Sequence, residues 1–171
     1  MIHTARLTGT PLADSDFDDL CALHADVRVV SAFHTDPLTH QETREFLDDK
    51  LAHWREHGFG IWVFRDSGDT FVGRCGLHRR VIEGEDAIDF GYIVEPERWS
   101  QGYATEMGEA VAAYGFDMLR FPELVGTTWQ DNMASQRVLE KLGFERVGPI
   151  DAGLGVLFRL RAPQRPKPLL P

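Results

Sequence analysis

A loop whose backbone could bind a pyrophosphate is the most informative stretch of the sequence. It runs over residues 94–106 (VEPERWSQGYATE), where a strand-like segment ends and a helical pattern begins. The first N–H groups of a helix have no partner inside the helix and carry partial positive charge. Gly102 and Ala104 are small enough to let a phosphate approach these groups. The loop contains neither GxxxxGK[ST] nor GxGxxG, so it is neither of the two best-known phosphate motifs, and a strand–turn–helix with one glycine is common.

The second informative segment is residues 132–144 (NMASQRVLEKLGF). Asn132 can cap a helix, and Ser135 lies one turn further along on the same side. Val138, Leu139 and Leu142 fall at helical spacing and supply an apolar face. The periodicity predicts an amphipathic helix and by itself indicates no ligand.

The elements that position these segments follow from the hydrophobic periods. Thr39 and Glu42 form a capping box for a helix that ends at Gly58. The remaining predictions are strands over 4–9, 60–65, 70–78, 86–94, 124–129, 144–147 and 154–160, and helices over 14–24, 105–119 and 133–142. This order predicts an α/β fold with one mixed sheet and helices on its faces. We expect one domain over 1–161 and a disordered tail over 162–171, which holds four prolines.

Composition narrows the classes of partner. The net charge of −9 argues against nucleic acid as a partner, because binding a phosphate backbone demands a basic face. The negative charge favours a cationic substrate; the alternative is that the charge serves only solubility. The two cysteines form no CxxC, so no metal site is expected. The absence of a signal-peptide pattern and of a long apolar run predicts a cytoplasmic protein that does not enter a membrane.

Together the two informative segments resemble the GNAT superfamily of acetyl-CoA-dependent N-acyltransferases. DFGYIVEPERWSQGYATEM is similar to the strand and pyrophosphate loop of the RimJ/RimL-type (ribosomal-protein N-acetyltransferase-like) branch. NMASQRVLEKLGF is similar to that branch's N-x-x-S-x-R-V-x-E-K-L-G-F, and HGFGIWVFRDSGDTFVGRCGLHR to its central hairpin. The match covers roughly residues 4–160. It is specific for fold and cofactor and weakly specific for substrate.

The resemblance implies a mostly antiparallel sheet of about seven strands, splayed between the fourth and fifth, with about four helices. Pantetheine would pair with the backbone in the splay, and pyrophosphate would bind the loop amides. Ser135 would lie near the thioester sulfur. The implied cofactor-binding residues are Ile93, Val94, Gln101, Gly102, Tyr103, Ala104, Thr105, Asn132 and Ser135.

Two departures from the family pattern affect the expected chemistry. Ser100 stands where the branch usually has Gly, so the turn must suit a residue with a Cβ. Leu139 occupies the place of the Tyr that protonates the leaving thiolate in many members, which leaves Ser135 as the candidate near the sulfur.

Attack by an amine also calls for a base. Asp89 is the first candidate, on the strand face that carries Gly91 and Ile93; orientation of the substrate ammonium and a structural role are the alternatives. His78 is the second, because histidine titrates near neutrality, although a lone histidine at a strand end is usually a surface residue.

The sequence therefore predicts an N-acetyltransferase. Its acceptor is either a protein N-terminal amine or a small-molecule amine. The resemblance to the branch implies a monomer or a homodimer, and no sequence feature decides between them. The alternatives are a non-catalytic acyl-CoA sensor on the same fold, supported by Leu139, and an unrelated nucleotide-binding protein.

Overall fold

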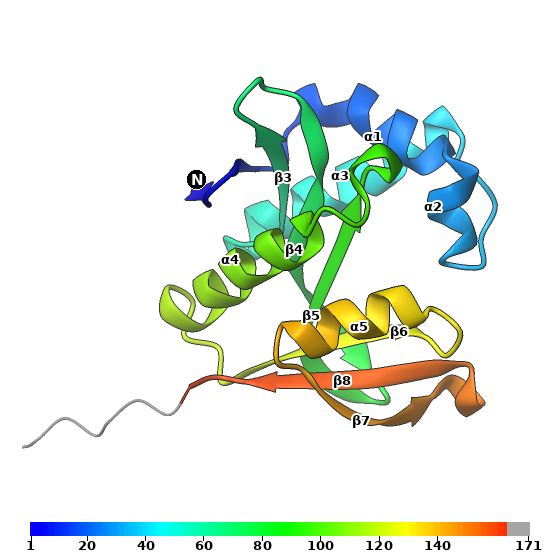
Figure 1. The fold of residues 1–171 in the computed structure, drawn as a ribbon, viewed down its shortest axis with the longest axis vertical. Coiled ribbons are helices and arrows are strands. Elements are labelled where there is room, and N and C mark those ends of the chain that lie inside the picture. The colour runs from blue at the N-terminus through cyan, green and yellow to red at the C-terminus, as the bar shows by residue number, and fades with distance from the viewer. Residues whose placement is uncertain (164–171) are drawn as a thin grey trace, which may run out of the picture.

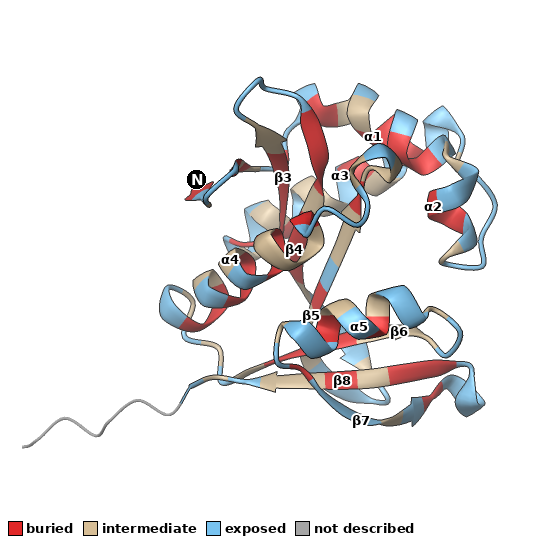
Figure 2. Cartoon of the chain, viewed as in Figure 1, coloured by how far each residue is buried: buried red, intermediate tan, exposed pale blue. Residues whose placement is uncertain are grey.

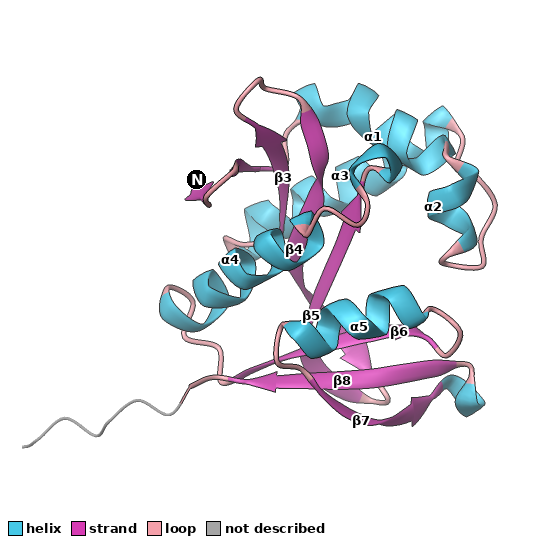
Figure 3. Cartoon of the chain, viewed as in Figure 1, coloured by secondary structure: helices cyan, strands magenta, loops and turns pink. Residues whose placement is uncertain are grey.

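The helices and strands follow the sequence pattern closely in the computed structural model, which describes residues 1–163 (Figures 1 and 3). The predicted tail over 162–171 lies outside the described residues from position 164 onward. The strands are β1 (Ile2–His3), β2 (Leu7–Pro11), β3 (Ile61–Asp66), β4 (Phe71–Ile82), β5 (Glu85–Val94), β6 (Glu123–Trp129), β7 (Glu145–Ile150) and β8 (Gly155–Arg161). The α-helices are α1 (Phe17–Ala25), α2 (Val27–Ser31), α3 (His40–His57), α4 (Tyr103–Asp117) and α5 (Met133–Lys141).

Helix α3 shows how local sequence sets an element's ends. The Thr39 hydroxyl accepts from the backbone N–H of Glu42, and the Glu42 carboxylate accepts from the N–H of Thr39. At the other end Gly58 takes the left-handed conformation, with φ of 72°. The predicted capping box and glycine stop are both confirmed.

Two predictions need correction at the N-terminal end. The strand expected over residues 4–9 is two short strands, because the Thr4 hydroxyl and the Leu7 backbone close a turn between β1 and β2. Helix α2 was not predicted; it is five residues long and begins where the Asp26 carboxylate accepts from the N–H of Arg28. The described residues thus form eight strands and five α-helices rather than about seven and about four.

All eight strands lie in one sheet, in the order β1-β2-β3-β4-β5-β6-β8-β7. β4 and β5 pair along their length, from Gly73↔Val94 to Ile82↔Glu85. β5 and β6 are parallel and share one paired position, Asp89↔Val125. Beyond it the strands diverge, and Figure 1 shows β5 rising away from β6. β5 and β6 correspond to the fourth and fifth strands predicted from the sequence, so the expected splay between them is confirmed.

The sheet has a separate apolar core on each face, because alternate residues of each strand point to opposite sides. Trp62 and Phe64 of β3 pack with Met107 of α4 on one face. Val63 packs with Leu47 of α3 on the other. β3 is buried on both faces (Figure 2). β3 and β4 therefore lie between the two cores, on the β5 side of the splay.

Candidate active site

The β5–α4 loop presents backbone groups at the N-terminus of α4. Gly102 precedes the helix with φ of 82° and provides no side-chain cap. The N–H groups of Tyr103, Ala104 and Thr105 have no partner inside the helix. Ser100 also has a positive φ, 61°, which is uncommon for a residue with a Cβ, so the turn keeps a conformation that favours glycine and does not suit Ser100 as expected. The loop can accommodate an anion of the kind the sequence indicated.

Hydrogen bonds from Trp99, within the loop, and from Arg6, near the N-terminus, hold this loop in place. The Trp99 indole N–H donates to the Val94 carbonyl at 2.7 Å. Arg6 donates through Nη1 to the Gln101 carbonyl at 3.0 Å and through Nε to Glu106 at 2.6 Å. Burial acts to raise the pKa of Glu106, but hydrogen bonds from Thr4 and Arg6 lower it overall, so the carboxylate stays ionised. Arg6 thereby places a cation beside the loop, a role that the sequence did not reveal.

A hydrogen bond joins the two sides of the splay. Tyr92 of β5 donates its hydroxyl proton to Ser135 Oγ of α5 at 3.3 Å. Burial, the largest influence, raises the pKa of Tyr92 to about 12, so the phenol is protonated at neutral pH. Ser135 is positioned by its N–H, which donates to the Asn132 side chain at 3.0 Å. Tyr92 was not predicted as a site residue, since its alternation on the strand indicates only a core position.

Asp89 lies at the apex of the splay, where β5 and β6 pair. Its side chain is 14% exposed and accepts from Arg80 at 2.8 Å. Burial raises the pKa of Asp89 and outweighs the opposing effect of Arg80. A partly buried carboxylate of this kind accepts a proton more readily than an exposed one.

His78 pairs with Asp89 across β4 and β5. Its Nε2 accepts from the Lys50 ammonium at 3.3 Å, and its ring stacks on His53 at a centroid distance of 3.8 Å. Burial, helped by the charge of Lys50, lowers the pKa of His78 to about 4. The ring is therefore neutral at neutral pH, and its accepting nitrogen already has a donor.

A segment from α2 reaches across to the β6–α5 loop. Trp129 Nε1 donates to the Phe33 carbonyl at 3.0 Å, and the Asn132 side chain donates to the Ala32 carbonyl at 3.3 Å. His34 stacks on Trp129 with centroids 4.7 Å apart. Asn132 therefore uses its amide N–H₂ within the protein, while the predicted contact of that group with pantetheine stays a prediction.

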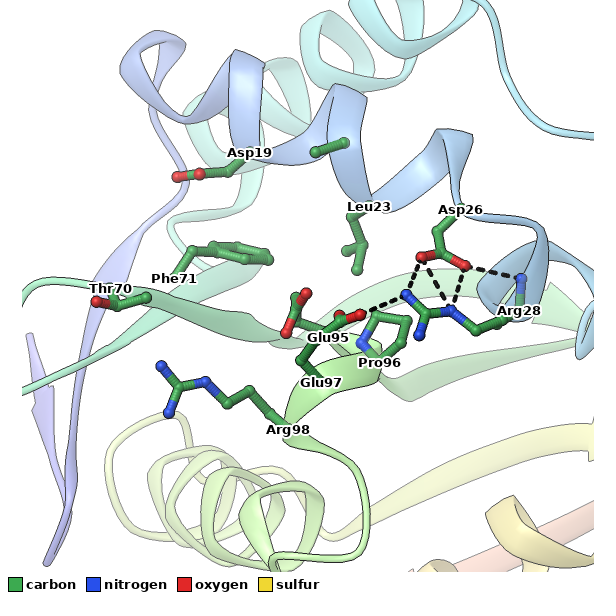
Figure 4. Close-up of a pocket in the computed structure, with 11 residues that line it drawn as sticks. Asp19, Leu23, Asp26, Arg28, Thr70, Phe71, Glu95, Pro96, Glu97 and Arg98 are labelled. Carbon is green, nitrogen blue, oxygen red and sulfur yellow. Dashed lines mark hydrogen bonds and ion pairs between the residues drawn. The ribbon is translucent and has the colours of Figure 1, made fainter.

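A hollow of about 580 Å³ lies beside the loop, between α1, the β3–β4 turn and the segment after β5 (Figure 4). Arg28 bridges its wall by pairing with Asp26 and with Glu97, the latter at 2.8 Å. The predicted cofactor-binding residues do not line it. Among residues 1–163, no cluster of His, Cys, Asp and Glu could hold a metal ion, and no helix is long and apolar enough to cross a membrane.

Comparison with known proteins identifies the family. A family model described as "Acetyltransferase (GNAT) domain" matches residues 6–145. The chain belongs to the GNAT acetyltransferase family. The chain is 28% identical over 141 residues to the uncharacterized protein YkkB of Bacillus subtilis, with 82% of each chain covered. It is 31% identical over 163 residues to the FsC-acetyl coenzyme A-N(2)-transacetylase of Aspergillus fumigatus, covering 85% of this chain and 65% of that protein.

The fold is shared with solved GNAT structures. An acetyltransferase from Agrobacterium tumefaciens superposes with a TM-score of 0.81 at 24% identity, covering 94% of this chain and 93% of the other. The family and its relatives establish the chain as an acetyl-CoA-dependent N-acetyltransferase. The GNAT family's use of acetyl-CoA fits the open amides at the start of α4.

The structure brings the predicted site residues together around one splay. Ile93 and Val94 lie on β5, Gln101–Thr105 at the start of α4, and Asn132 and Ser135 at the start of α5. Arg6, Tyr92 and Arg80 join them although the sequence did not single them out. Their contacts become visible only in the structure: Arg6 is about 100 residues from its partner Glu106, and Tyr92 is 43 residues from Ser135.

Proposed function

We propose that this enzyme transfers the acetyl group to a primary amine by direct attack within a ternary complex. The observation that carries the proposal is the splay, with one paired position at its apex and the Tyr92–Ser135 hydrogen bond across it. Bound acetyl-CoA would supply the thioester. Gly102 and the amides of Gln101–Thr105 would bind the pyrophosphate, and Ile93, Val94 and Asn132 the pantetheine arm.

In this proposal Asp89 takes the proton from the amine, through a water molecule. At neutral pH, deprotonation costs about 1 kcal/mol for an α-amine of pKa near ~8 and about 4–5 kcal/mol for a lysine amine near ~10.4. Asp89 is favoured over His78 because burial raises the pKa of Asp89, whereas burial lowers the pKa of His78, whose accepting nitrogen already faces the Lys50 ammonium. His78 then positions Lys50 and His53.

Tyr92 and Ser135 would serve the departing thiolate. Leu139, at the place of the usual acid, is buried and apolar. Ser135 Oγ already accepts from the Tyr92 hydroxyl, so it can donate its own proton to the thiolate and take the proton of Tyr92 in exchange. The Tyr92 phenolate left by this transfer regains a proton from solvent once the CoA thiol has left, which completes the cycle. This relay replaces the missing tyrosine of α5 with one on β5 and argues against the non-catalytic sensor.

Release of the CoA thiol tests the proposal. The purified chain is given acetyl-CoA with a panel of peptide N-termini, polyamines and amino-acid derivatives. We expect thiol release that depends on the amine. When both substrates are varied, double-reciprocal plots of the initial rate should give intersecting lines. Parallel lines would contradict direct attack, and release by none of the amines would favour the sensor.

The placement in the RimJ/RimL-type branch rests on the Trp99–Glu106 motif and is proposed on that basis. A cytoplasmic location and a single domain over 1–161 are proposed from composition and sequence pattern alone. A monomeric or dimeric state is proposed from the resemblance to the RimJ/RimL-type branch.

A further inference from the structure

Arg74 is a partly buried arginine without a charged partner in the described residues. It lies in the middle of β4, paired with Val63 on one side and Ile93 on the other. Its Nε is buried and has no hydrogen-bond partner in residues 1–163. Two other partly buried arginines behave differently: Arg65 pairs with Asp16 and Asp19, and Arg98 pairs with Asp66.

The surroundings of Arg74 do not neutralise its charge. Its guanidinium lies over the Phe46 ring, 4.8 Å from the centroid. His24 packs edge-on against the same ring, and burial, followed by the charge of Arg74, lowers the pKa of His24 to about 4. Burial also lowers the pKa of Arg74 to about 10, which leaves it a cation at neutral pH. An unpaired, partly buried cation is unfavourable for stability, and an anionic ligand would supply the partner that Arg74 lacks.

The position of Arg74 relates it to the reacting groups. Along β4 and β5 the pairs Arg74↔Ile93, Gly76↔Gly91 and His78↔Asp89 follow one another on the face that α3 covers. Phe46 lies near Arg74 and Lys50 near His78, so α3 runs along β4. Gly91 between them is exposed, and a Cβ added there meets nothing within 4 Å.

On β5 this arrangement leaves the backbone at Gly91 open between Asp89 and the position paired with Arg74. The two pairs are four residues apart, about 13 Å along the strands. A guanidinium presents a planar fork of N–H donors that matches a carboxylate in bidentate geometry. An acceptor lying over Gly91 would therefore meet a carboxylate at one end and an arginine at the other.

We propose that Arg74 binds a carboxylate of the acceptor, so that the substrate class is an amine that also bears a carboxylate. This inference rests on the proposed function and refines it. The spacing along the strands selects an acceptor whose two groups are separated by a spacer, such as an ω-amino acid or a dipeptide, with its amine at Asp89. Simple polyamines and alkylamines lack the group that Arg74 would bind.

The first experiment measures kcat/KM for matched acid and amide acceptors. 4-Aminobutyrate is compared with 4-aminobutyramide, and glycylglycine with glycylglycinamide. We expect the wild-type enzyme to prefer each acid by at least about tenfold, the scale of one charge-assisted contact, and Arg74→Met to lose that preference by raising KM for the acid. Arg74→Lys should restore part of it, and Arg55→Met, which removes an exposed arginine of α3, should retain all of it. Equal use of acid and amide by the wild type would overturn the proposal.

The second experiment detects carboxylate binding without turnover. Thermal unfolding is followed with CoA and either 4-acetamidobutyrate or 4-acetamidobutyramide, which mimic products. We expect the acid alone to raise the Tm further, and only in chains that keep Arg74. Arg74→Met should not lower the Tm of the free chain, because Met can pack against Phe46 and removes an unpaired charge. A lower Tm in Arg74→Met with unchanged acid stabilisation would assign Arg74 to structure alone.

The two experiments separate this inference from the proposed function. Thiol release from amines without any preference for acids would overturn the inference and leave N-acetyl transfer in place. If no amine releases thiol, the proposed function falls, and the equilibrium measurement still decides whether Arg74 binds a carboxylate.

Discussion

The two sides of the splay are built differently. The proposed cofactor side consists mostly of backbone: the amides at the start of α4 and the edge of β5 that does not pair with β6 after Asp89. The proposed acceptor side consists of side chains from β4, β5 and α3, namely Arg74, His78, Asp89 and Lys50. A backbone site requires small residues at fixed spacing and leaves a motif in the sequence. A side-chain site is assembled from residues far apart and leaves none. The cofactor can therefore be identified from sequence, while the acceptor must be inferred from the structure.

The largest expected effect tests the backbone side. Gly102→Glu should weaken acetyl-CoA binding by about 100-fold or more, because it places a carboxylate where the pyrophosphate would lie. Gly84→Glu is a matched control: Gly84 has a φ of 83° at the β4–β5 turn, so it adds the same charge and the same backbone strain elsewhere. Titration calorimetry measures both. Equal affinity in the two variants would remove the loop from the cofactor site.

The acceptor side should respond in turnover rather than in cofactor affinity. Asp89→Asn should lower kcat by about 100-fold, within the range for loss of a general base, and leave the Kd for acetyl-CoA unchanged. Asp86→Asn, an exposed carboxylate on the same strand, serves as the control. Steady-state kinetics measures the loss of kcat, and titration calorimetry measures any loss of affinity for acetyl-CoA. Unchanged kcat in Asp89→Asn would assign the carboxylate to structure or to substrate binding.

The contact that joins the two sides should give an intermediate effect. Tyr92→Phe should lower kcat about tenfold, because Ser135 would lose the donor that resupplies its proton. Ser135→Ala should act similarly, and the double variant should be no worse than the single ones. Tyr114→Phe removes a hydroxyl from a ring that packs on Trp62 and should have no effect. Additive losses in the double variant would contradict a shared relay.

The smallest expected effect is on how stability depends on pH, and it involves His24, which packs with Arg74 against the Phe46 ring. His24 has a pKa of about 4 in the folded chain and about 6.5 when unfolded. Between these values the unfolded chain binds the proton and the folded chain does not, so stability is present above about pH 6.5 and is lost as pH falls toward 4. His24→Gln should reduce this loss, measured as Tm from pH 7.5 to 4.5. The exposed His40 provides a control, and His40→Gln should match wild type. The same slope in all three chains would contradict the assignment.

The fold was largely predictable because its signals are local. The Thr39–Glu42 box, the stop at Gly58 and the alternation of β5 each depend on neighbours in sequence. The single paired position between β5 and β6 is a long-range property and came only from resemblance. Helix α2 was not predicted because five residues are too few to establish a helical period.

The site was predictable in the same uneven way. Gly102 was singled out for its small size, whereas the positive φ of Gly102 and of Ser100 was not predicted. Tyr92 was not singled out from the sequence, because nothing in its segment indicates that α5 brings Ser135 Oγ within 3.3 Å of its hydroxyl. Arg74 lies in a run of apolar and small residues, and only three-dimensional packing shows that it lacks a partner.

Thermal unfolding with acetyl-CoA, CoA and ATP in parallel tests the central claim most directly. A ligand at about 100 times its Kd adds about 2.7 kcal/mol of stability, which shifts the Tm of a chain of this size by several degrees. We predict a shift with both CoA species, none with ATP, and none with any ligand in Gly102→Glu. A wild-type chain that responds equally to ATP, or to none of the three, would contradict the assignment of the splay and its loop to acetyl-CoA.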